Sequence, residues 1–119
     1  MTIDTYQRTQ NIAESPRACE RRLINEVTAE LVAASTTGMT GVALMPALHR
    51  NREMWNTFSL LCSDDENGLT PELRAGIVSL AGWVSRYTSN VVAGKDCIDP
   101  LVEVNQILAE GLETTALAA

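Results

Sequence analysis

Residues 70–93 read TPELRAGIVSLAGWVSRYTSNVVA, and this stretch decides the fold class. Thr70 offers a capping hydroxyl, and Pro71 stands where the first helical residue would fall, which together are typical of a helix start. Gly94 follows as a stop signal. Between these signals, apolar residues recur at alternating steps of four and three, the spacing of one stripe on a helix: Leu73, Ile77, Leu80, Val84, Tyr87 and Val91. The pattern predicts a helix over residues 71–93.

The same signals recur on both sides of this helix. Ser15-Pro16 and Asp99-Pro100 predict two more helix starts, and glycines 38, 41 and 68 interrupt the intervening pattern. Apolar periodicity between these breaks predicts three further helices: 16–34, 42–62 and 100–113.

Pro46 falls close to the start of the second of these helices. A helix that begins at Val42 would need the backbone N–H that proline lacks. We therefore expect a slight kink there.

The predicted fold class is all-α, an antiparallel bundle of four main helices in one domain, 1–119. Residues 1–14 form an N-terminal arm, which either adds a short helix or lies extended over the bundle. Residues 114–119 are predicted to be a frayed tail. No stretch alternates strictly between apolar and polar residues, as a half-buried strand would.

Composition and charge exclude several classes of function. No apolar run approaches the length that crosses a bilayer, and residues 1–10 contain no hydrophobic signal region, so we expect a cytoplasmic protein with no membrane partner. The net charge is −6, and all of the excess lies in residues 61–119. The only basic cluster, Arg17, Arg21 and Arg22, is short, so direct nucleic-acid binding is not expected.

No set of residues suggests catalysis, a metal or a cofactor. His49 is the only histidine, and we expect it at the surface, without a partner ligand. Residues 64–68 superficially resemble a calcium loop, but position twelve would be Arg74 rather than glutamate, so we predict a solvated turn. Three widely spaced cysteines, Cys19, Cys62 and Cys97, fit reduced thiols better than disulfides or zinc ligands. We expect a protein that is not an enzyme.

Two asparagines lie on predicted apolar helix faces. Asn51 falls among the apolar residues of its helix, and Asn105 does the same near the C-terminus. A buried amide costs free energy unless it is hydrogen-bonded. Each either satisfies a neighbouring backbone group or meets the other across the core, as structural polar residues. Alternatively, they fix the register of the bundle or line a groove for a partner.

The helix over 71–93 is apolar around about half of its circumference, which exceeds what a bundle helix needs. Trp83 lies beside the main stripe. The surplus indicates either a central helix or a surface that binds a partner, for which tryptophan is a favoured anchor.

Four segments in the same order resemble the FlaF family of flagellar biosynthesis regulators. The first comprises Tyr6-Gln7 and Ser15-Pro16-Arg17 with Glu20. The more specific ones contain Asn51-Arg52-Glu53-Met54-Trp55 and, near the end, Leu101-Val102-Glu103-Val104-Asn105. Between them lies Leu69-Thr70-Pro71-Glu72-Leu73-Arg74. The 35–41 linker and the region around Cys97 have no counterpart in this resemblance.

The resemblance implies a cytoplasmic bacterial protein required for flagellin synthesis and secretion, which binds flagellin as a chaperone. Candidate partner contacts are Arg52, Met54, Leu61 and Trp83. The alternative is post-transcriptional regulation through the protein FlbT and flagellin mRNA, without direct flagellin binding. Direct RNA contact would use Arg17, Arg21 and Arg22, and a wide apolar face could equally close a homo-oligomer.

Overall fold

The computed structural model describes residues 15–118, with side chains described for residues 15–113. The elements in this part of the chain are α2 (Pro16–Thr36), the short 3₁₀ helix η1 (Gly41–Leu44), α3 (Met45–Leu61), α4 (Pro71–Val92) and α5 (Asp99–Ala118). Residues 15–118 contain no strand, so the all-α prediction is confirmed. The predicted N-terminal arm, residues 1–14, lies outside the described residues.

Side-chain caps start two of the helices as predicted. The hydroxyl of Ser15 accepts a hydrogen bond from the backbone N–H of Ala18 at 3.1 Å, and that of Thr70 accepts one from Leu73 at 3.2 Å. In each case a proline follows the cap. These bonds satisfy N–H groups that have no acceptor within the helix.

The start of α5 differs from the prediction by one residue. The helix begins at Asp99 itself, and the carbonyl of Ile98 accepts from the N–H of Leu101 at 2.9 Å. Asp99 therefore lies in the first turn rather than at the cap. Its carboxylate there still interacts favourably with the positive end of the helix dipole.

The start of α3 also differs, and Pro46 explains why. The prediction began this helix at 42, but the structure has 3₁₀ geometry from Gly41 to Leu44 and α geometry only from Met45. An α-helix running from Val42 would require an N–H donor at Pro46, which proline lacks. Starting the helix at Met45 places Pro46 in the first turn, where no such donor is needed.

The C-terminal helix is longer than predicted. It continues to Ala118, past the predicted end at 113 and through most of the stretch predicted to fray. Residues 114–118 contain neither glycine nor proline, and alanine and leucine favour helix, so no local signal stops it.

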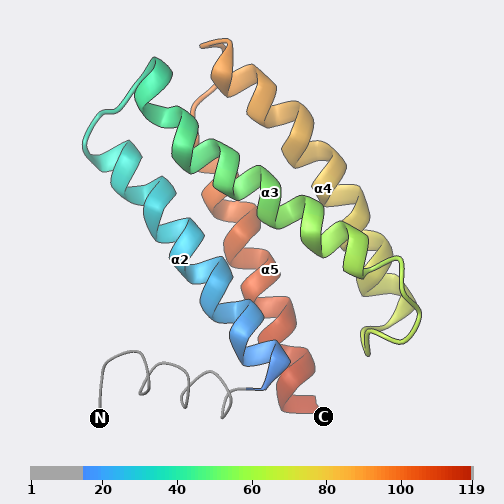
Figure 1. Ribbon diagram of the computed structural model, residues 1–119. Coiled ribbons are helices and arrows are strands. Elements are labelled where there is room, and N and C mark those ends of the chain that lie inside the picture. The colour runs from blue at the N-terminus through green and yellow to red at the C-terminus, as the bar shows by residue number, and fades with distance from the viewer. Residues whose placement is uncertain (1–14, 119) are drawn as a thin grey trace, which may run out of the picture.

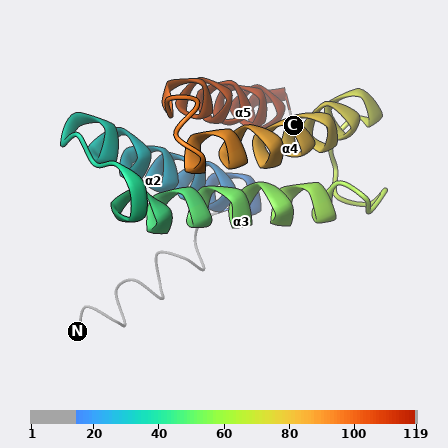
Figure 2. The same cartoon turned by 90° about the horizontal axis from the view of Figure 1, so that it is seen from above.

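The four α-helices run alternately up and down, with α2 beside α5 and α3 beside α4 (Figure 1). These two pairs make the most extensive contacts, and α2 also packs on α3. By contrast, α4 and α5, although consecutive in the chain, approach each other little. Figure 2 shows α3 and α5 on opposite sides of the bundle.

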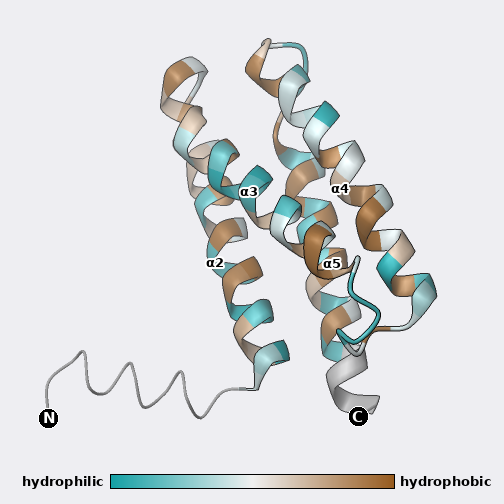
Figure 3. Ribbon diagram, turned by 45° about the vertical axis from the view of Figure 1, so that its right-hand side comes forward, coloured by the Kyte–Doolittle hydropathy of each residue, from teal (hydrophilic) through white to brown (hydrophobic). Residues whose placement is uncertain are grey.

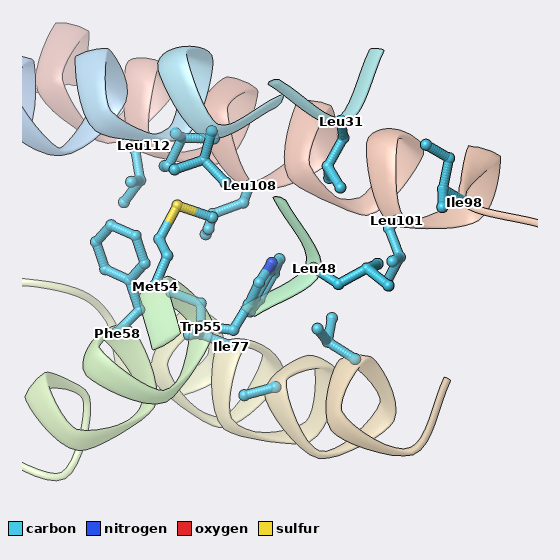
Figure 4. Packing of buried hydrophobic residues seen from close by; sticks show 14 of the residues in the cluster. Leu31, Leu48, Met54, Trp55, Phe58, Ile77, Ile98, Leu101, Leu108 and Leu112 are labelled. Atoms are coloured by element: carbon cyan, nitrogen blue, oxygen red, sulfur yellow. The ribbon is translucent and has the colours of Figure 1, made fainter. Parts of the chain in front are cut away.

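Large side chains from α3 fill the space between the two helix pairs. Trp55 is fully buried and Phe58 almost so, and they lie among Met54, Leu108 and Leu112 in Figure 4. One continuous cluster of apolar residues extends through all four helices. Such a core supplies most of the stabilisation of a small helical domain.

Candidate partner-binding site

An apolar groove lies between α2 and α3 on the surface of the bundle. We call it the α2–α3 groove, and its volume is about 380 Å³. Leu23 and Val27 contribute from α2, and three large side chains contribute from α3: Met54, Phe58 and Leu61. Grooves of this kind, apolar with a few polar groups at the edge, are typical of binding sites.

A second groove lies at the end of the bundle where α2 begins. This end groove, of about 410 Å³, is lined by Ser15 and Pro16 and by apolar residues from the other helices and the α3–α4 loop: Phe58, Leu61, Leu69, Ile77 and Leu112. Glu20, Phe58 and Leu61 line both grooves. The two grooves therefore adjoin each other, and together we call them the trough.

Among the large apolar residues that line the trough, Leu61 is the most exposed to solvent. Its side chain is 48% exposed, although it lines both grooves. Its neighbour Leu60 is 73% exposed but lines neither of them. A leucine held half in water at the junction of two grooves is favourably buried by any apolar group that enters there.

Charged residues flank the α2–α3 groove. Glu20 pairs with Arg17 at 2.7 Å, and Arg50 bridges to Glu26 at 3.7 Å and also pairs with Glu30. Glu53, on α3, adds a further carboxylate to the lining of this groove. The rim therefore carries both signs of charge around an apolar floor, as interfaces commonly do.

The structure places two of the four candidate contact residues in this groove. Met54, which is buried, and Leu61 line it together. Arg52 does not: it reaches α4, donating to the carbonyl of Ser85 at 2.9 Å and to the hydroxyl of Ser89 at 3.0 Å. Arg52 thus joins α3 to α4.

Trp83 lies on α4, away from the trough. Its ring stacks on that of Tyr87 with centroids 4.8 Å apart. The Tyr87 hydroxyl donates to the carbonyl of Cys97 at 2.7 Å. Partial burial, and then the negative charge of Asp96, raise the pKa of Tyr87. This pair fastens α4 to the α4–α5 connection and belongs to another face of the molecule.

The two asparagines predicted on apolar faces are both fully buried and hydrogen-bonded to each other. Asn105 donates through Nδ2 to Oδ1 of Asn51 at 2.8 Å, and its own Oδ1 accepts from Trp55 Nε1 at 2.7 Å. Nδ2 of Asn51 has no acceptor among the described residues. This polar network joins α3 to α5 across the core and lines neither groove.

The arginine cluster does not form a basic patch. Arg17 pairs with Glu20 and donates to the carbonyl of Asn67, while Arg22 pairs with Glu26 at 3.3 Å. Arg21 lines a polar cleft that also contains two acids of α5, Glu110 and Glu113. Acidic neighbours offset the charges that phosphate binding would require.

The remaining polar residues occupy ordinary positions. Residues 64–68 lie in the α3–α4 loop, which is mostly hydrophilic (Figure 3), and Asp65 accepts from Arg74 at 2.8 Å. His49 is exposed, as predicted. Cys62 is buried, and this burial raises the pKa of its thiol, whereas Cys97 is exposed. Within residues 15–113, no three His, Cys, Asp or Glu side chains are grouped so as to hold a metal ion.

Most residues of the trough could not be recognised as a site from the sequence. Leu23 and Val27 are recognisable as apolar face residues of α2, but their pairing with Met54 and Leu61 depends on how α2 packs against α3. The adjacent apolar pair Leu60-Leu61 at a helix end was the available signal, because both cannot face the core.

The family comparison covers nearly the whole chain. The family model described as "Flagellar protein FlaF" matches residues 2–112. No curated protein and no solved structure matches. Among the described helices, none is both long and apolar enough to cross a membrane.

Proposed function

Because this chain belongs to the FlaF family of flagellar proteins, we propose that it serves flagellum biogenesis by binding flagellin as a secretion chaperone. The proposed role is binding, not catalysis, and it operates in the cytoplasm before flagellin is exported. A helix of flagellin would lie in the α2–α3 groove.

The observation that carries this proposal is the half-exposed Leu61 above an apolar groove between two helices. The terminal segments of flagellin form amphipathic helices, and such helices bind by laying an apolar face into a groove. Met54 and Phe58 would receive the anchor side chains, and the charges of Glu20, Arg50 and Glu53 would align the helix.

The alternative partner is FlbT, which would connect the protein to flagellin mRNA without direct flagellin binding. The same groove could receive a helix of that protein. Direct RNA contact is the weaker proposal, because Arg17 and Arg22 are paired with carboxylates.

The test is isothermal titration of the purified protein with monomeric flagellin, with the Leu61→Glu variant alongside. We expect saturable binding by the wild type. Replacing Leu61 removes about 2 kcal/mol of apolar burial, so affinity should fall about 30-fold or more.

Leu60→Glu is the matched control. It makes the same change one residue earlier on α3, outside the groove, and should leave affinity close to that of the wild type. Equal losses in the two variants would contradict the groove as the site. No heat with flagellin at two temperatures, together with binding to FlbT, would make FlbT the direct partner.

A further inference from the structure

We propose that the trough is occupied by the chain's own N-terminal arm, residues 1–14, when no partner is bound. This inference goes beyond the proposed function, because it concerns the protein alone and requires no flagellin. Four observations support it: the position of Ser15, where the arm joins α2, the length of the arm, its composition, and the family match.

The arm joins the described part of the chain at Ser15, beside the trough. Ser15, its immediate neighbour, lines the end groove together with Leu61. Ser15 has extended backbone geometry, with φ −67° and ψ 156°, as expected for a residue before proline. The backbone at Ser15 is therefore extended rather than helical, and this residue lies next to the apolar residues of the end groove.

The arm is longer than the α2–α3 groove, whether it is helical or extended. From Leu61 to Arg50, α3 rises about 16 Å at 1.5 Å per residue. Fourteen residues span about 21 Å as a helix and at most about 50 Å when extended. Either length exceeds that of the α2–α3 groove.

The chemistry of the arm fits the trough. Most of its residues are polar, and four are large and apolar: Met1, Ile3, Tyr6 and Ile12. The trough offers Leu61 half-exposed and an apolar floor made by Leu23, Val27, Met54 and Phe58. Burying the arm's apolar side chains against this floor removes both surfaces from water.

The arm also belongs to the domain that the family shares, since the family model matches from residue 2 onward. Residues 2–14 thus share the family pattern with the helices that form the trough. A segment that had no role in the domain would not be expected to carry this pattern.

The test replaces Tyr6 with the photo-crosslinking residue p-benzoylphenylalanine in the full-length protein, without any partner. Irradiation of a mixture of ordinary and ¹⁵N-labelled chains, followed by peptide mass spectrometry, separates cross-links within one chain from those between chains. We expect cross-links within one chain to the α3 peptide that contains Met54 and Leu61. Cross-links between chains would assign the trough to a second copy, and cross-links elsewhere or none would also overturn the proposal.

Two controls sharpen this result. The same photo-crosslinking residue in place of Ile107, exposed on α5, should give no cross-link to the α3 peptide. Adding Leu61→Glu to the Tyr6-substituted protein should reduce the intramolecular yield several-fold, whereas adding Leu60→Glu should not. Since flagellin is absent, failure here leaves the proposed function standing, and failure of the titration leaves this inference standing.

Discussion

At the scale of single residues, the hydrogen-bonded chain Trp55–Asn105–Asn51 determines how α3 and α5 face each other. The three groups lie 50 and 54 residues apart in sequence, yet their bonds measure 2.7 and 2.8 Å. A buried polar group without a partner costs more than its hydrogen bond contributes, so sliding or rotating α5 would be penalised. We interpret the network as a register device in an otherwise apolar core.

Replacing Asn105 with leucine should therefore destabilise the protein, although leucine has a similar size. The Nε1 of Trp55 would lose its acceptor and the Oδ1 of Asn51 its donor, both inside the core. We expect the free energy of unfolding to fall by about 2 to 4 kcal/mol. Urea unfolding followed by tryptophan fluorescence measures it.

Asn56→Leu is the control, because Asn56 is exposed on the same helix as Asn51. Its free energy of unfolding should stay within about 0.5 kcal/mol of the wild type. An Asn105→Leu variant as stable as Asn56→Leu would show that the network contributes little.

Burial of both asparagines could be inferred from the sequence, because each lies on an apolar helix face. The direction of the Arg52 side chain could not be inferred in this way. A long side chain at the edge of such a face can turn toward either neighbour, and only the position of α4 directs it to Ser85 and Ser89. The same ambiguity applies to Trp83, whose partner Tyr87 lies one turn along its own helix.

At the scale of elements, the starts of α2 and α4 were predicted correctly because their signals are local. A hydroxyl followed by proline needs nothing outside four or five residues to specify a start. The end of α5 was not predicted: the helix passes its expected end because no glycine or proline stops it. The 3₁₀ turn before α3 was anticipated only as a kink at Pro46, since the competition between two helix geometries depends on packing.

The Thr70 cap should contribute measurably to the free energy of unfolding. Thr70→Ala removes the acceptor for the N–H of Leu73 and should lower the free energy of unfolding by about 1 kcal/mol. Urea or thermal unfolding provides the measurement. Ser79→Ala, at an exposed position within the same helix, should be neutral or slightly stabilising because alanine favours helix. A loss in Ser79→Ala equal to that in Thr70→Ala would contradict the capping role.

At the scale of the whole molecule, the trough exists only because four separate parts of the chain meet at one end of the bundle. Arg17 makes one of these connections, reaching from the first turn of α2 to the carbonyl of Asn67 in the α3–α4 loop. Neither the periodicity of a helix nor its caps specify which helices become neighbours. The sequence therefore predicted the helices but not the groove between them.

Arg17→Ala should loosen the loop at this end of the trough. Hydrogen exchange of the amides in residues 63–69 should accelerate, while the core helices keep their protection. Arg22→Ala removes a surface ion pair with Glu26 on the same helix and should leave the loop unchanged. Unchanged exchange in Arg17→Ala would mean that Leu69 and the Asp65–Arg74 pair hold the loop without it.

The pairing of α2 with α5 also has a consequence for synthesis on the ribosome. Among the described helices, the first to be made, α2, packs most extensively against the last, α5, whereas α3 and α4, adjacent in the chain, can pair as soon as both have emerged. The apolar face of α2 therefore stays without its main partner until α5 has been made and has left the ribosome. Until α5 arrives, the nascent chain exposes this apolar face to general chaperones.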